Sequence, residues 1–224
     1  MNLIIFDAFN TLITAHPGFR RTFLDGLARV GLGPSLPLLN DLQAASAGIA
    51  HVEWSRSRGA YVGWAQETLR LVSKVGRRQG PAFAPRIVPA LEQLYQAPMI
   101  PMPGAAACLT TLKAGGYQIA VCSNWGWDLE ADFRPTGLAG YIDIFAPSAQ
   151  AGFRKPHHRI YEAVLAESGS CAENAVFIGD SVKADVLGPQ QVGIRAIHLT
   201  SYPVDGYSGE HASSLMAVAE LLAG

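Results

Sequence analysis

The sequence has almost no net charge and no long apolar segment. Its 17 Lys and Arg residues nearly balance its 18 Asp and Glu residues, which leaves a formal net charge of −1. Such a balance gives no general attraction to nucleic acid or to an acidic membrane surface. No apolar run approaches the roughly 20 residues that a membrane-spanning helix needs. We therefore predict that neither nucleic acid nor a membrane is a partner.

Cysteine is also scarce. Cys108, Cys122 and Cys171 are odd in number and widely spaced, which argues against a disulfide framework or a zinc site. The apolar stretch near the N-terminus ends at Asp7 after a few residues, so it is too short for the core of a secretory signal. We expect a cytoplasmic protein whose cysteines stay reduced.

What the sequence does contain is an alternation of apolar strands and helical segments. Four large apolar residues, Leu3 to Phe6, predict a strand that is buried on both faces, as in the middle of a parallel sheet. From about residue 102 onward, helices predicted at 105–114, 156–167 and 184–192 alternate with strands predicted at 117–123, 144–146, 175–178 and 196–199. This alternation predicts an α/β fold with a parallel sheet.

A long helical stretch interrupts this alternation. Residues 16–97 show helical patterns only, separated by Gly and Pro, and we interpret them as an insertion after the first strand. The predicted domains are a core of residues 1–14 and 98–224 and a helical domain of residues 15–97. Residues 16–97 hold ten Lys or Arg residues against five Asp or Glu residues. This local excess of positive charge suits a small anionic metabolite as a partner.

Polar residues stand at the ends of the predicted strands. In chain order they are Asp7, the pair Ser123 and Asn124, then Lys155, and finally Asp180 and Asp185. In open α/β sheets, ligands bind beyond the carboxyl ends of the strands. Each residue alone has an ordinary explanation, since Asp7 or Asp180 can cap a turn or helix and Lys155 can lie on the surface. Together they predict a site in which Ser123 and Asn124 hold phosphate oxygens and the two later acids hold Mg²⁺.

The same residues, in this order, resemble the four motifs of the haloacid dehalogenase superfamily. The resemblance implies a Rossmann-like three-layer core with strand order 5-4-1-2-3, an all-helical cap, and an active site between the two. It also implies the residue roles: Asp7 as the nucleophile with Thr11 in its loop, Ser123 as the phosphate-holding hydroxyl, Lys155 as the neutralising cation, and Asp7, Asp180, Asp185 and the backbone carbonyl of Phe9 as Mg²⁺ ligands.

Phe9 departs from the pattern of the family. Phosphatases of the family usually carry a second aspartate at this position, which protonates the leaving group and then activates water. A phenylalanine side chain can do neither. Our first hypothesis is therefore a Mg²⁺-dependent phosphohydrolase that acts on a small phosphorylated metabolite through an aspartyl-phosphate at Asp7 and lacks this acid.

Two alternatives stay open. The loop from Asp7 to Thr11 is similar to that of L-2-haloacid dehalogenases, which form an aspartyl ester without a metal. Asp180 argues against this reading, because that subgroup has a small polar residue at the corresponding position. The other alternative is a catalytically weak member of the family that binds or regulates. The sequence is compatible with a monomer or a homodimer.

Overall fold

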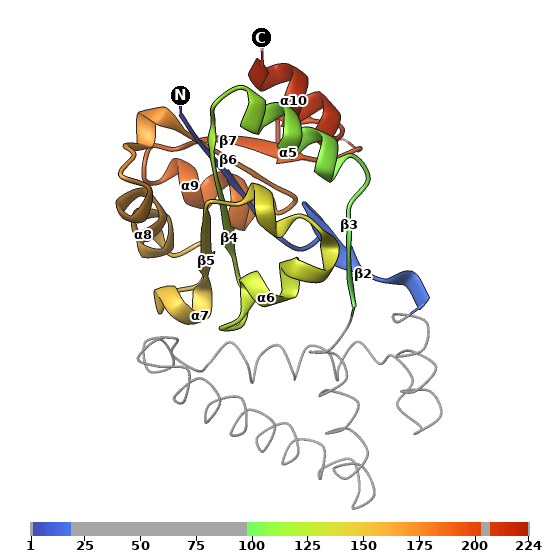
Figure 1. Cartoon of the computed structure of the whole chain (residues 1–224). Helices are drawn as coiled ribbons and strands as arrows, with labels where there is room; N and C mark the ends of the chain where they lie inside the picture. Colours follow the sequence, from blue (N-terminus) through green and yellow to red (C-terminus); the bar gives the residue numbers. More distant parts are fainter. Residues whose placement is uncertain (1, 19–97, 203–206, 224) are drawn as a thin grey trace, which may run out of the picture. The chain divides into compact units, whose positions relative to one another are not determined.

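The computed structural model describes residues 2–18, 98–202 and 207–223 (Figure 1). The chain divides into two compact units, Met1–Thr14 with Met99–Gly224, and Ala15–Pro98. Most of the second unit lies outside the described residues, so the helical cap assigned to residues 15–97 stays a prediction. Within the described ranges, no helix combines the length and the apolar character that crossing a membrane requires.

The central strand of the first unit is β1 (Leu3–Phe6), whose four residues are fully buried. It pairs in parallel with β4 (Gln118–Ser123) on one side and with β6 (Ala175–Gly179) on the other. Large apolar side chains cover both faces of such a strand, as expected for the middle of a parallel sheet. Phe6 lies opposite Val121 and Ile178, so the three strands end close to the same line. The residues that follow these strands are thereby brought to one edge of the sheet.

The described residues form a six-stranded sheet in the order β5-β4-β1-β6-β7-β8, in which neighbouring strands are parallel. The remaining strands of this sheet are β5 (Ile144–Pro147), β7 (Arg195–Leu199) and β8 (His211–Ala212). Strands β5, β4, β1, β6 and β7 stand in the order that the family resemblance implied, and β8 extends the sheet beyond β7. A separate two-stranded sheet contains β2 (Ile13–Ala15) and β3 (Met99–Pro101).

Helices cover both faces of this sheet. Within the described residues, the α-helices are α5 (Ala105–Ala114), α6 (Leu129–Phe133), α7 (Ser148–Ala151), α8 (His158–Ser168), α9 (Gly188–Gln190) and α10 (Leu215–Ala223). The 3₁₀ turns are η2 (Arg134–Thr136), η3 (Ala139–Tyr141) and η4 (Ala172–Asn174), and η5 (Val182–Leu187) is π-helical. The helix predicted at 184–192 is therefore wrong as one continuous α-helix, because its first part is a π-helical turn.

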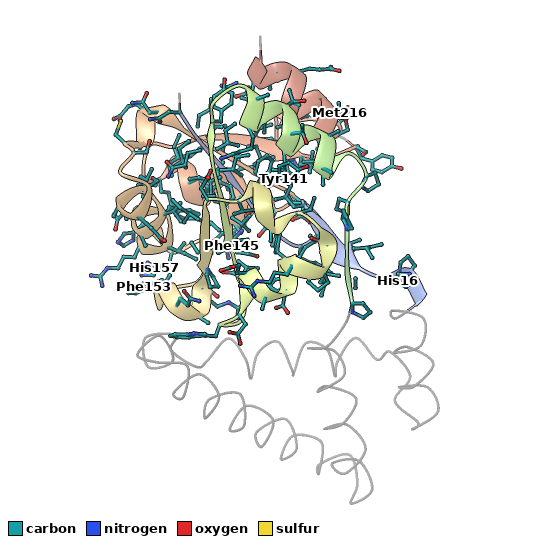
Figure 2. All side chains as sticks on the ribbon, viewed as in Figure 1. His16, Tyr141, Phe145, Phe153, His157 and Met216 are labelled. Carbon is teal, nitrogen blue, oxygen red and sulfur yellow. The ribbon has the colours of Figure 1, made fainter. Side chains whose placement is uncertain are left out.

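Alternate residues of β1 point to opposite faces of the sheet, as the pleat of a strand requires. Ile4 and Phe6 belong to an apolar cluster with residues of α5 and α10, which lie side by side (Figure 1). Leu3 and Ile5 belong to a second cluster with residues of α8. In the cluster that contains residues of α5 and α10, Phe145 of β5, labelled in Figure 2, packs edge-on against Phe133 of α6. Their ring centroids lie 5.4 Å apart. The sheet and its two helical layers agree with the predicted three-layer core.

The contact of α5 with the sheet can be tested at Leu109, which is fully buried. We expect Leu109→Ala to lower the free energy of unfolding by about 2–5 kcal/mol, because a buried leucine leaves a cavity when it is shortened. Thr111→Ala on the exposed side of the same helix is the control and should change it by less than about 0.5 kcal/mol. Urea unfolding measures both, and equal values would contradict the packing described for α5.

Candidate active site

An ionic cluster lies beyond the carboxyl ends of β1, β4 and β6. The Nζ of Lys155 donates to Oδ1 of Asp7 and to Oδ1 of Asp185, at 2.6 Å in each case. The Oγ of Ser123 donates to Oδ1 of Asp7 at 2.9 Å. All four residues are buried. Residues that are far apart in the sequence therefore meet at one carboxylate, that of Asp7, which two donors hold in place.

The backbone of Lys155 is itself held by Asn124. The Oδ1 of Asn124 accepts from the backbone N–H of Lys155 at 2.7 Å, and its Nδ2 donates to the backbone carbonyl of Lys155 at 3.1 Å. The sequence predicted that Asn124 binds phosphate. In the structure, both ends of this amide bond to the backbone of the residue that carries the ammonium, and a contact of Asn124 with phosphate stays a prediction. Asn124 thus joins the end of β4 to the loop that presents Lys155.

The two later acids lie in a short segment that we call the acidic loop, residues 180–185. Asp185 is buried on η5, and its Oδ2 accepts from the backbone N–H of Ser181 at 2.9 Å. Gly179, the last residue of β6, allows this approach, because a Cβ there would lie 2.4 Å from Cγ of Asp185. Asp180 is exposed. Two carboxylates, one buried and one open to solvent, therefore follow the strand directly.

Three carboxylates gather at this edge of the sheet. Asp7, Asp180 and Asp185 each offer a carboxylate oxygen, and these oxygens all lie within 4.8 Å of one another. Carboxylates this close repel each other unless a cation neutralises them. Hard oxygen donors are also the ligands that Mg²⁺ prefers in proteins. The donor set therefore fits the magnesium ion that the sequence predicted.

The pKa values follow from burial and from these charges. Burial raises the pKa of Asp185 to about 6, although the nearby Lys155 acts in the opposite direction. Burial, followed by the charge of Asp7, raises the pKa of Asp180. For Lys155, burial alone would lower the pKa, but the charges of Asp7 and Asp185 outweigh it and raise the pKa above its ordinary value. Lys155 therefore remains an ammonium ion in this site.

Cys122 lies in β4 beside Ser123, and burial raises the pKa of its thiol to about 12. A thiol with such a pKa is not ionised at neutral pH and is a poor nucleophile. Cys108 is also buried, whereas Cys171 is exposed, so the interpretation of the cysteines as small buried residues is correct for two of them and wrong for Cys171. Asp7 is left as the nucleophile candidate in the cluster.

Phe9 and Thr11 occupy the loop after Asp7 in different ways. The side chain of Phe9 is 40% exposed, and its ring centroid lies 6.4 Å from that of Trp125. Thr11 is fully buried, and its Oγ1 has no hydrogen-bond partner among the described residues. The structure therefore gives Thr11 no direct bond to Asp7, and it places an aromatic pair where the loops after β1 and β4 come close.

Sequence reasoning missed two side chains that contact the acidic loop. The hydroxyl of Tyr161 donates to the backbone carbonyl of Ala184 at 2.5 Å. The Nε2 of His198 lies 3.0 Å from the backbone carbonyl of Asp180. Tyr161 lies between apolar residues on the buried side of α8, and His198 lies in the buried part of β7, so both side chains are interpreted from the sequence as core residues. Only the strand register, which pairs His198 with Gly179, reveals the second contact.

An α/β core with an ionic cluster at the carboxyl ends of its central strands has its ligand site at that edge, as is typical of enzymes with such sheets. A model of the haloacid dehalogenase-like hydrolase family matches residues 1–193, and the chain belongs to this family.

Curated relatives resemble part of the chain. It is 31% identical to a glyceraldehyde 3-phosphate phosphatase of Methanothermobacter thermautotrophicus over 105 residues, and this alignment covers 45% of each chain. It is 31% identical over 104 residues to a ribulose-1,5-bisphosphate 5-phosphatase of Halopiger xanaduensis, which covers 46% of this chain and 44% of the relative. A haloacid dehalogenase-like hydrolase domain-containing protein 3 of Bos taurus is 31% identical over 133 residues, 57% of this chain and 53% of the relative. The matches span about half the length of these relatives.

Solved structures share the fold over nearly the whole chain. A phosphatase of Thermococcus onnurineus covers 100% of this chain and 99% of its own, with a TM-score of 0.65 and 21% identity. The alignment with the hydrolase YfnB of Bacillus subtilis, solved bound to magnesium, covers 99% of this chain and 98% of YfnB, with a TM-score of 0.69 and 16% identity. The alignment with a dehalogenase solved as an intermediate complex covers 100% of this chain and 98% of the dehalogenase, with a TM-score of 0.71 and 20% identity. At such identities the likeness concerns the fold alone.

The close approach at Gly179 leads to a direct test. We expect Gly179→Ala to lower the free energy of unfolding by about 1–3 kcal/mol, because the added Cβ overlaps the buried carboxyl group of Asp185. Gly140→Ala is the matched control, since a Cβ there meets no atom within 4 Å. Urea unfolding compares the two, and a Gly179→Ala protein as stable as its control would contradict the packing of Asp185 against β6.

Proposed function

We propose that this protein is a Mg²⁺-dependent phosphohydrolase that acts on a small phosphorylated metabolite through an aspartyl-phosphate at Asp7. The observation that supports it best is the pair of 2.6 Å bonds that join Lys155 to Asp7 and to Asp185. An ammonium ion in this place holds the nucleophile by a charge-assisted hydrogen bond and offsets the charge of an incoming phosphate. The names of the relatives, which are phosphatases of small sugar or triose phosphates, support the substrate class.

The reaction would proceed in two displacements. In the first, an oxygen of Asp7 forms a bond to phosphorus while the bond from phosphorus to the leaving oxygen breaks, and the alcohol takes its proton from solvent. In the second, water attacks phosphorus, releases inorganic phosphate and restores the carboxylate. Ser123 would turn its hydroxyl from Asp7 toward a phosphate oxygen, and Lys155 would neutralise the charge between carboxylate and phosphate.

Asp7, Asp180, Asp185 and the backbone carbonyl of Phe9 would hold the magnesium ion. When bound, Mg²⁺ supplies positive charge that allows a carboxylate and a phosphate to approach each other. The buried Asp185 is fixed by Lys155 and by the N–H of Ser181, whereas Asp180 is open to solvent. We further propose that residues 15–97 form a helical cap over a cytoplasmic enzyme, as a monomer or a homodimer.

A second candidate function, dehalogenation at carbon, is favoured by Phe9, since an alkyl halide needs no proton on its leaving group. The acids of the acidic loop count against it. Asp180 and Asp185 lie within 4.8 Å of the Asp7 carboxylate, and without a cation they would repel a substrate that is itself a carboxylate. A member of the family that binds a phosphorylated ligand without turnover is the third possibility.

The nucleophile assignment is tested with Asp7→Asn on a panel of phosphate esters, with and without Mg²⁺. We expect phosphate release that depends on Mg²⁺ and falls by about 10⁴-fold or more in the variant, because an amide cannot form the acyl-phosphate. Asp143→Asn, which changes an acid that pairs with Lys113 outside the cluster, should keep the wild-type rate.

Other outcomes of this experiment favour the alternatives. Release of halide from 2-chloropropionate that a chelator does not affect would establish the dehalogenase. Absence of turnover combined with thermal stabilisation by a phosphorylated ligand would establish the binding protein. Wild-type phosphate release by Asp7→Asn would remove Asp7 from the mechanism.

The absence of an acid at position 9 predicts a strong dependence on the leaving group. We expect hydrolysis of p-nitrophenyl phosphate, whose leaving group needs no proton, and much slower hydrolysis of glycerol phosphate. Phe9→Asp should raise the rate ratio of the alkyl to the aryl ester by about 10²-fold, within the usual range for general acid catalysis. Phe9→Asn is the control, because asparagine has nearly the shape of aspartate but no titratable proton. Equal alkyl-to-aryl rate ratios in the two variants would refute the role of position 9 as the site of a general acid.

A further inference from the structure

We infer that Tyr161 and His198 are positioning residues that fix the acidic loop by holding its backbone at both ends. The inference rests on the proposed function, because it concerns the carboxylates proposed as magnesium ligands. Within the part of the chain that the structure describes, neither side chain hydrogen-bonds to a carboxylate. Each donates to a backbone carbonyl of the loop, one at Asp180 and one at Ala184, directly before Asp185.

The hydroxyl of Tyr161 donates to a backbone carbonyl that lacks a backbone donor within its own helical turn. In the π-helical turn η5, a carbonyl accepts from the N–H five residues later, and the N–H of Gly188 indeed donates to the carbonyl of Lys183. The next carbonyl, that of Ala184, would need the N–H of residue 189, but this residue is Pro189 and has none. The hydroxyl of Tyr161 takes its place at 2.5 Å. A side chain from α8 thus completes the turn that carries Asp185.

The packing around Tyr161 fixes its hydroxyl. The residue is fully buried, and its ring lies edge-on to that of Phe177 in β6, with centroids 5.7 Å apart. The same Phe177 ring has Nζ of Lys155 5.1 Å from its centroid. Gly188 leaves the space that the hydroxyl occupies, since a Cβ there would lie 2.2 Å from it. The ring that orients Tyr161 therefore also lies against the cation of the site.

His198 holds the other end of the loop. It lies in β7 opposite Gly179 and is 2% exposed. A carbonyl oxygen can only accept, so the Nε2 that faces Asp180 carries the proton. The Nδ1 has no hydrogen-bond partner among the described residues, and the ring packs edge-on against that of Tyr207, with centroids 5.4 Å apart. The strand next to β6 thereby fixes the residue with which the acidic loop begins.

Two fixed ends have a consequence for metal binding. The single ammonium ion of Lys155 pairs with Asp7 and Asp185 but cannot offset the charge of three carboxylates whose oxygens lie within 4.8 Å of one another. A loose loop would relieve the remaining repulsion by moving the acids apart. Two backbone carbonyls bonded to side chains of α8 and β7 keep Asp180 and Asp185 close before a metal ion binds. Outer groups that orient ligands in this way typically affect metal affinity or activity by about 10- to 100-fold.

Tyr161→Phe tests the inference because it removes the hydroxyl alone. We expect the Kd for Mg²⁺, measured by calorimetry with magnesium chloride, to rise about 10-fold. At saturating Mg²⁺, kcat for p-nitrophenyl phosphate should fall more than KM rises. Hydrogen exchange, followed by mass spectrometry without metal, should become faster in residues 181–188. His198→Leu should act similarly, and His198→Gln, which keeps a donor, should restore part of the affinity.

Tyr117→Phe is the matched control. Its hydroxyl donates to the backbone carbonyl of Leu222 at 2.7 Å, so the same kind of bond is lost, but outside the acidic loop. It should leave the Kd for Mg²⁺ and the exchange of residues 181–188 unchanged. An unchanged Kd and unchanged exchange in Tyr161→Phe, or an equal effect in Tyr117→Phe, would overturn the inference. A wild-type protein that binds no Mg²⁺ would refute the proposed function, and the exchange data would still decide whether these side chains hold the loop.

Discussion

The structure depends on one buried ammonium ion placed between two carboxylates. The side chains of Lys155, Asp7 and Asp185 are 2%, 10% and 1% exposed, so three charges have left water together. Burying any one of them alone would cost several kcal/mol, and only close pairing with further hydrogen bonds offsets that cost. Ser123 at Asp7, Ser181 at Asp185 and Asn124 at the backbone of Lys155 supply those further bonds.

The register of the sheet makes this pairing possible. Because Phe6 stands level with Val121 and Ile178, the chain leaves three strands at nearly the same height, and the polar residues follow at once. The short strands β1 and β6 consist of buried residues without charged side chains, so the charged residues of the site lie beyond the carboxyl ends of these strands. The same arrangement explains why Asp185 needs a glycine at the end of β6 and a tyrosine from α8 to complete its turn.

Much of the fold could be predicted from the sequence, because it depends on local patterns. Four consecutive apolar residues place β1 in the middle of a parallel sheet, and the strand predicted at 175–178 ends one residue before the observed β6. The convergence of Asp7, Ser123, Lys155 and Asp185 was predicted from their places after the strands together with the family resemblance. The family and the α/β fold are confirmed, whereas the proposed chemical roles of these residues stay proposals.

What could not be predicted depends on contacts between distant segments. The bonds of Asn124 to the backbone of Lys155 join residues 31 positions apart, and nothing near Asn124 in the sequence indicates that partner. The π-helical turn could not be distinguished from an α-helix by periodicity, and Pro189 shows in the sequence only that the carbonyl of Ala184 needs another donor. Tyr161 and His198 read as core residues, since nothing in their own segments shows which carbonyl they face.

The most direct test of the account removes the ammonium ion and then one of its partners. In the presence of a chelator, Lys155→Met should lower the free energy of unfolding by about 3–5 kcal/mol, because it leaves two carboxylates buried without a cation. Adding Asp185→Asn to that variant should restore at least about 1 kcal/mol, although the protein has lost another charged group. A Lys155→Met protein as stable as the wild type, or a double variant whose loss equals the sum of the two single losses, would contradict the central role of this interaction.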